Sequence, residues 1–132
     1  MTATFNDLQE PTNVLHGTRF HSVDAVASLL ESFAGRAPFL FELRGDNGMM
    51  LTIGFAGEGG TVQYASASGA PPYLMAVSRD AVDDGDVVEF LTGNTPTAIS
   101  TSFCIPIRDV MEVISAFLSR GDRSAAVDWE ET

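Results

Sequence analysis

The chain has 132 residues, 45% of them apolar, and its 18 acidic residues against seven arginines and no lysine give a formal net charge of −11. This length suits one domain whose core needs no cross-link, and with Cys104 as the only cysteine an internal disulfide is excluded. The charge argues against direct binding to nucleic acid or an anionic membrane, because both need a positive protein face. No apolar run approaches the roughly 20 residues of a membrane-spanning helix, and no signal peptide opens the chain, so we expect a cytoplasmic protein.

Three segments are predicted at the beginning of the chain. Residues 1–11 are expected to form a flexible arm, and Asn13 to Phe20 a short edge strand. Ser22 is a favourable helix N-cap, apolar residues follow it at helical spacing, and Gly35 is placed to end the helix. We therefore expect an amphipathic helix between Ser22 and Gly35.

A run of strands follows the first helix. The apolar segments 39–44 and 49–56 are separated by Gly45-Asp-Asn-Gly48, whose glycine and asparagine residues tolerate the positive φ of a tight hairpin turn. A second glycine-rich turn, residues 57–60, leads into a strand over 61–65. These segments predict a three-stranded antiparallel meander.

Three more strands are predicted, at residues 73–78, 87–91 and 97–103. The first two are joined by an acidic connection, residues 79–86, and the last two by a Thr-Gly-Asn-Thr-Pro turn at 92–96. Gly, Asn and Pro favour turns because of the φ angles they accept.

A second amphipathic helix and an extended tail are expected at the end of the chain. Pro106 suits the first position of a helix, an apolar stripe follows it, and Gly121 ends the helix. Residues 127–131 form the tail. The order of elements predicts an α+β fold, a mostly antiparallel sheet with two main helices packed on it, in a single domain over residues 1–132.

Patterns that would support catalysis or metal binding are weak. The mostly apolar neighbours of Cys104 predict a buried structural thiol, although a Cys–His pair with His21 stays open because such partners meet in space rather than in sequence. His16 and His21 lack accompanying zinc ligands, and the acidic residues 83–89 lack the full calcium-loop pattern. We expect no cofactor, no metal and no enzymatic activity.

Two acidic stretches suit the recognition of a basic partner. Residues 79–89 hold five carboxylates against one arginine, and residues 128–131 surround the only tryptophan with carboxylates. A field of one sign speeds encounter with an oppositely charged protein, and aromatic anchors rimmed by charge are common energetic centres of interfaces. Trp129 has a second interpretation, in which it pins the tail to the sheet. The candidate partner-binding residues are Asp80, Asp83, Asp84, Asp86, Glu89, Asp128, Trp129, Glu130 and Glu131.

Short motifs in the last third of the chain are the most specific part of the sequence. They are Pro71-Pro-Tyr73, Val87-Val-Glu-Phe90, Ile105-Pro106 at a helix start, Phe117-Leu-Ser-Arg-Gly121 and Val127-Asp-Trp-Glu-Glu131. In this order, and with the hairpin around residues 45–48, they resemble the Imm1 family of bacterial immunity proteins over residues 20–131. Members of the family often carry a proline between the glycine and the tryptophan, where this chain has Arg123-Ser-Ala-Ala126.

The resemblance implies an α+β fold and a cognate toxin as the partner, frequently a nucleic-acid deaminase of the SCP1.201-like group. Such a deaminase binds nucleic acid and holds its zinc-bound water in an accessible pocket. An acidic inhibitor that lies in the nucleic-acid channel denies entry to the substrate. We therefore expect an immunity protein that neutralises its toxin by occluding the substrate-binding cleft.

A small-ligand binding or regulatory domain is the alternative function. Its pocket is expected between the sheet and the helices, lined by Met49, Met50, Phe55 and Tyr64. A deep pocket with converging polar groups would favour this alternative.

Overall fold

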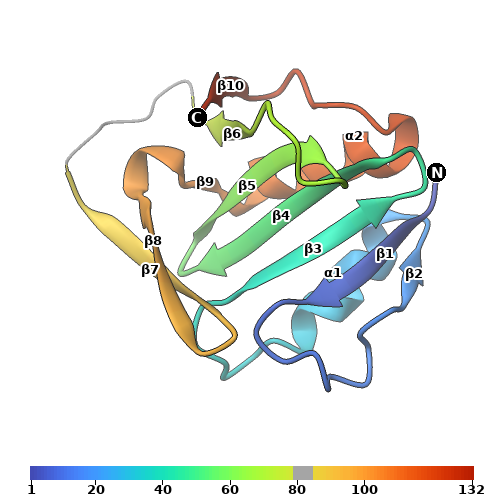
Figure 1. Cartoon of the computed structure of the whole chain (residues 1–132), viewed down its shortest axis with the longest axis horizontal. Helices are drawn as coiled ribbons and strands as arrows, with labels where there is room; N and C mark the ends of the chain where they lie inside the picture. The colour runs from blue at the N-terminus through green and yellow to red at the C-terminus, as the bar shows by residue number, and fades with distance from the viewer. Residues whose placement is uncertain (79–84) are drawn as a thin grey trace.

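Ten strands, two α-helices and one 3₁₀ turn make up the parts of the chain that the computed structural model describes, residues 1–78 and 85–132 (Figure 1). In chain order the elements are β1 (Ala3–Asp7), β2 (Arg19–Phe20), α1 (Val23–Glu31), β3 (Leu40–Gly45), β4 (Met49–Ala56), β5 (Gly59–Ser66), β6 (Leu74–Val77), β7 (Val87–Thr92), β8 (Thr95–Ser100), η1 (Thr101–Phe103), β9 (Ile105–Pro106), α2 (Ile107–Arg120) and β10 (Asp128–Glu131).

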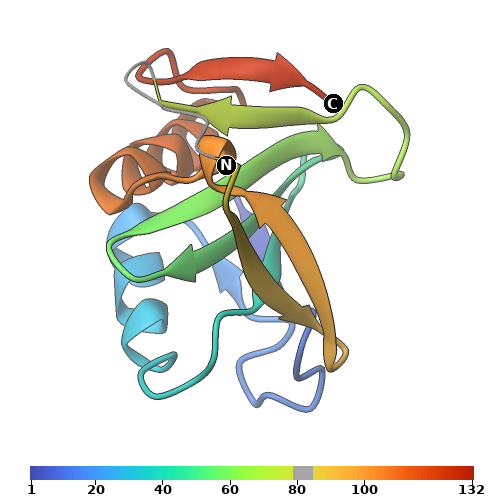
Figure 2. The same cartoon turned by 90° about the vertical axis from the view of Figure 1, so that its left-hand side faces the viewer.

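An antiparallel sheet forms the centre of the molecule, with strands in the order β10-β6-β5-β4-β3-β1-β2 and with β9 paired to β5. The predicted meander is confirmed as β3, β4 and β5. Their register pairs Phe41 with Ile53 and Ile53 with Val62, so these buried side chains share one face. Both helices cover that face, and the β7–β8 hairpin lies on the other side of the sheet (Figure 2). The mostly antiparallel α+β arrangement with two helices agrees with the prediction from the sequence.

The N-terminal segment differs from the expectation. The sequence predicts a flexible arm over residues 1–11, but the structure places Ala3–Asp7 inside the sheet as β1, between β3 and β2. Ala3, Phe5 and Asp7 alternate with less buried residues and point into the core. The sequence pattern does not indicate a strand here, because one of only three inward-facing residues is charged. The predicted edge strand over 13–20 shrinks to the two residues of β2.

Hydrogen bonds and an ion pair compensate the charge of the Asp7 carboxylate in the core. It accepts hydrogen bonds from the backbone N–H of Gln9 and Glu10 at 2.9 and 2.7 Å, and from Asn13 Nδ2 at 3.0 Å. Arg36 Nη1 forms an ion pair with its Oδ2 at 2.9 Å. These bonds replace the water that the buried carboxylate loses, and they hold residues 8–13 in turns instead of a longer strand.

Local capping signals set the helix boundaries. Ser22 Oγ accepts a hydrogen bond from the N–H of Ala25, as predicted for an N-cap, but α1 ends at Glu31, earlier than the expected Gly35. Pro106 is the N-cap of α2 and not its first helical residue. Gly121 ends α2 in the left-handed conformation, with a φ of 69° that favours glycine.

The β7–β8 hairpin places one aromatic ring against the sheet. Gly93 and Asn94 both have positive φ, which matches a two-residue type I′ turn, so β8 begins at Thr95 and ends at Ser100, shifted from the predicted 97–103. Phe90 is fully buried. A Cβ on Gly54 would lie 2.6 Å from its ring, so only glycine leaves room for Phe90 there.

Candidate functional site

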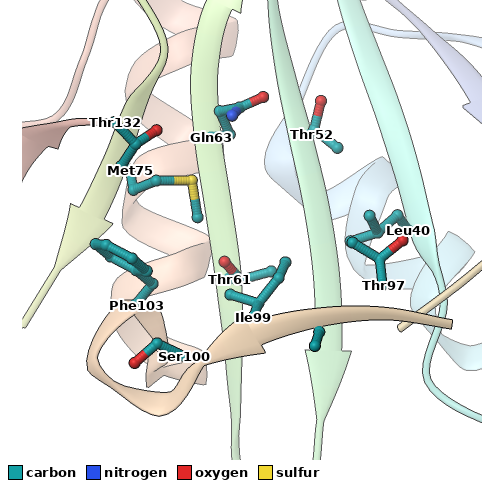
Figure 3. Close-up of a pocket in the computed structure, with 11 residues that line it drawn as sticks. Leu40, Thr52, Thr61, Gln63, Met75, Thr97, Ile99, Ser100, Phe103 and Thr132 are labelled. Atoms are coloured by element: carbon teal, nitrogen blue, oxygen red, sulfur yellow. The ribbon is translucent and has the colours of Figure 1, made fainter. Parts of the chain in front are cut away.

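The face of the sheet opposite the helices carries a groove of about 390 Å³. Its floor is formed by open-face side chains of β3 to β6, namely Leu40, Thr52, Thr61, Gln63 and Met75, and its wall by residues 97–100 and Phe103. Figure 3 shows β8 crossing in front of β4 and β5, with these side chains around the space above it. The groove exists because the hairpin covers only one end of this face.

Polar groups without partners lie on the groove floor. Thr61 is only 2% exposed, and its hydroxyl oxygen has no hydrogen-bond partner. Thr52 and Gln63 are half-buried beside it, and their side chains form no hydrogen bond with any residue that the structure describes. Buried polar groups are normally paired, so an unpartnered cluster of this kind is typical of a binding site.

Two carboxylates adjoin the groove through the strand register. Glu42 pairs with Thr52 and Glu130 with Met75, and each of these partners lines the groove. Glu89 pairs with Ala98 and points away from the sheet, because the neighbouring pair, Phe90 and Thr97, faces the sheet. Side chains at paired positions lie on the same face of a sheet. Glu42 also bonds Arg44 Nε at 3.0 Å. The groove is therefore an acceptor-rich, acidic site.

The candidate residues of the C-terminal tail divide between two faces. Register places Asp128 and Glu130 on the open face with Val77 and Met75, and Trp129 and Glu131 on the helix side with Ala76 and Leu74. Both Asp128 and Glu130 are exposed. The four candidate residues therefore form two sets on opposite faces of the sheet, and the set of Asp128 and Glu130 lies on the face that carries the groove.

Trp129 holds β10 in place. Its indole Nε1 donates a hydrogen bond to the carbonyl of Ser124 at 2.9 Å, and its ring meets Tyr64 edge-on at 6.2 Å between centroids. The side chain packs against the core cluster. This geometry agrees with the second interpretation, in which Trp129 pins the tail to the sheet.

The acidic connection is described only in part. Asp80, Asp83 and Asp84 lie outside the described residues. Asp86 is exposed just before β7, and its carbonyl accepts a hydrogen bond from the N–H of Thr101 at 3.0 Å. Glu89 is exposed on β7.

The histidines and the cysteine are separated by the sheet. His21 follows the edge strand β2 and contacts Thr2 Oγ1 through Nδ1 at 3.0 Å. Cys104 precedes β9, which pairs with β5, so the four strands β5, β4, β3 and β1 lie between the two residues. His16 Nδ1 accepts a hydrogen bond from the N–H of Asp7. Cys104 is half-buried, less than expected, and burial raises the pKa of its thiol, which disfavours the reactive thiolate.

The pocket predicted between sheet and helices is not assembled as expected. Met49 and Tyr64 pack against the core. Met50 lies on the open face of β4, and Phe55 lines a smaller cavity of about 190 Å³ beside Phe33. The expectation rested on strand residues without knowing which face each takes, and the larger groove lies on the opposite face.

The described residues contain neither a cluster of metal ligands nor a membrane-spanning helix. No three His, Cys, Asp or Glu side chains gather closely enough there to hold a metal ion. In the same residues no helix is both long and apolar enough to span a bilayer.

Comparison with protein families supplies the decisive observation. The model of the family described as immunity protein Imm1 matches residues 16–131. The chain belongs to the Imm1 family of immunity proteins. The resemblance seen over residues 20–131 is thereby confirmed, and the matched range begins four residues earlier, before β2. Among curated proteins, none matches this Imm1 chain.

The floor of the groove is the part of this Imm1 site that sequence reasoning missed. Thr52, Thr61 and Gln63 stand at alternate positions of β4 and β5, opposite in direction to the buried Ile53 and Val62. That alternation was a usable signal, because period-two patterns identify the polar face of a strand. No comparable pattern in the sequence indicates that the β7–β8 hairpin docks over that face.

Proposed function

We propose that this Imm1 protein binds a cognate toxin and neutralises it by occluding its substrate-binding cleft. The family match across residues 16–131 carries the proposal. Binding alone achieves the effect, so the inhibitor acts without a cofactor and without turning over a substrate of its own.

A nucleic-acid deaminase of the SCP1.201-like group is the proposed toxin, and the cytoplasm the proposed place of encounter. A cleft that holds nucleic acid is lined by positive charge. This chain has a net charge of −11, and the carboxylates of Glu42 and Glu130 adjoin the groove. Charge complementarity of this kind favours the inhibitor over the substrate in the same cleft.

Co-expression with the cognate toxin domain, which we expect to be encoded beside this gene, tests the proposal. Cells that express an active toxin domain are expected to survive when this protein is made with it, and to die when an unrelated Imm1 protein replaces it. The toxin must remain present in the surviving cells, as judged by its abundance. Death of cells in which both proteins accumulate would contradict the proposed function.

A small-ligand binding domain is the second candidate, favoured by the unpartnered hydroxyl of Thr61 beside Gln63 in the groove. Native mass spectrometry of the protein purified from its host distinguishes the two functions. A retained small molecule that the Thr61→Val variant releases would support the ligand. The first proposal expects the mass of the chain alone, and the mass of the complex when the toxin is present.

A further inference from the structure

We infer that the groove between β8 and the open face of the sheet is where the toxin docks, and that the toxin inserts an extended segment carrying one basic side chain. The inference rests on the proposed function and specifies its contact surface. Its occupant is defined by chemistry, as a lysine or arginine on a strand-like segment of the partner.

The first observation is that the hydroxyl of Thr61 is buried and has no hydrogen-bond partner. A buried polar group without a partner costs free energy, and Thr61 Oγ1 has none although the residue is 2% exposed. Figure 3 shows the Met75 side chain pointing toward Thr61. Methionine is unbranched and adapts its shape readily, so an entering side chain displaces it and gives the hydroxyl a partner.

The second observation is the chemistry of the floor. The Gln63 amide and the Thr52 hydroxyl each offer an oxygen acceptor, and no described residue uses either side chain in a hydrogen bond. Ammonium and guanidinium groups are donors only. Apolar neighbours such as Leu40 and Ile99 suit the aliphatic stem of a basic side chain, which packs along apolar surface while its charged end finds acceptors.

The third observation is the outer edge of β8. In the described chain β8 pairs only with β7. Thr92 and Thr95 flank the two-residue turn and form a hydrogen-bonded pair, and hydrogen-bonded and non-hydrogen-bonded pairs alternate from there along the hairpin. The pair of Ala98 and Glu89 is therefore non-hydrogen-bonded, so the backbone N–H and C=O of Ala98 point away from β7. Residues 97–100 line the groove consecutively, which requires that this edge borders it. An extended segment that adds to β8 satisfies these backbone groups.

The carboxylates beside the groove favour a basic segment of the partner over an acidic or neutral one. Glu130 is exposed and stands beside the groove-lining Met75 in the register, and Glu42 stands beside Thr52. Arg44 is the one basic residue paired with either of these two carboxylates in the described chain. An acidic segment would meet the like charges of Glu42 and Glu130, which costs affinity.

Matched variants of the full chain test the docking surface against the toxin domain encoded beside the gene, by the dissociation constant of the complex. Gln63→Leu and Thr61→Val are each expected to raise the constant about tenfold, the value of one hydrogen bond to a charged group. Thr4→Val is the control, because Thr4 lies on the same face at β1, away from the groove, and it is expected to change the constant less than about twofold.

Two further readouts separate a lost contact from a damaged fold. Thr61→Val removes an unpartnered hydroxyl, so the melting temperature of the free variant is expected to equal or exceed that of the wild type. Glu130→Gln is expected to weaken binding about threefold, as for an exposed ion pair, whereas Glu131→Gln, on the opposite face, leaves it unchanged.

Amide hydrogen exchange reports on the β8 edge directly. Exchange at the Ala98 N–H is expected to slow at least about tenfold in the complex, as for a newly formed backbone hydrogen bond. The N–H of Glu89, on the far edge of the hairpin, serves as the control.

The results separate the two proposals. Tight binding by the wild type together with unchanged affinity in Gln63→Leu and Thr61→Val overturns the docking site and leaves the proposed function standing. Absence of binding by the wild type itself overturns the proposed function and the docking site with it.

Discussion

The buried Asp7 carboxylate anchors the first strand, and its removal is expected to be costly. In Asp7→Asn the Arg36 guanidinium loses its charged partner at 2.9 Å, and the carboxylate that stays with it among the described residues is that of Glu10 at 3.7 Å. Breaking a buried ion pair costs about 3 kcal/mol because the remaining charge is left unpaired. Urea unfolding at pH 7 measures the loss. A change below about 0.5 kcal/mol, the size of an exposed pair, would contradict this role.

The same residue predicts a pH dependence. Burial raises the pKa of Asp7, but hydrogen bonds from Arg36, the Glu10 N–H and Asn13, with the charge of Arg36, outweigh it and hold the pKa below 3.8. The unfolded chain therefore binds the proton first as pH falls. The stabilising contribution is complete well above pH 3.8 and is lost as pH falls through the lowered pKa. The stability difference between wild type and Asp7→Asn is expected to shrink from pH 7 to pH 3.

Gly54 is expected to control how closely the β7–β8 hairpin packs on the sheet. Its Cβ would meet the Phe90 ring at 2.6 Å and Leu40 Cδ2 at 2.9 Å, so Gly54→Ala forces the ring outward at a cost of about 1–3 kcal/mol. Thermal unfolding of Gly54→Ala, Phe90→Leu and the double variant measures the coupling. Because leucine vacates part of the space, the double variant is expected to lose less than the sum of the single losses. Strict additivity would show that the two residues do not compete for space.

Strand β10 depends on Trp129, which we expect to stabilise the fold and leave the toxin interface unaffected. Trp129→Phe removes the indole donor and leaves the buried Ser124 carbonyl without that bond, at a cost of about 1 kcal/mol. Chemical denaturation checks the cost, and titration with the toxin domain checks the affinity. A stable variant that binds the toxin at least about tenfold more weakly would assign the residue to the interface.

Elements with local signals were predictable from the sequence, and elements that depend on distant partners were not. Ser22 caps α1 and Gly121 ends α2 through short-range backbone chemistry, and the hairpin turns between β3, β4 and β5 carry their own glycines. Strand β1 depends on an ion pair between Asp7 and a residue 29 positions later. The groove depends on Phe90 meeting Gly54, a contact between two separate hairpins.

The net charge of −11 is expected to control how fast the whole molecule meets its toxin. Exposed charges are screened beyond about 8–10 Å at physiological ionic strength. The association rate constant is therefore expected to fall about tenfold or more between 50 and 500 mM salt, while the dissociation rate constant changes much less. Stopped-flow mixing measures both. An association rate independent of salt would contradict steering by the acidic surface.

Titration of the purified toxin domain with this protein tests neutralisation by binding most directly. Toxin activity on its nucleic-acid substrate is expected to fall in proportion to the inhibitor added and to vanish at one equivalent, because each inhibitor molecule occupies one cleft. Full activity at a large excess of inhibitor, or complete inactivation by a small fraction of an equivalent, would contradict the account.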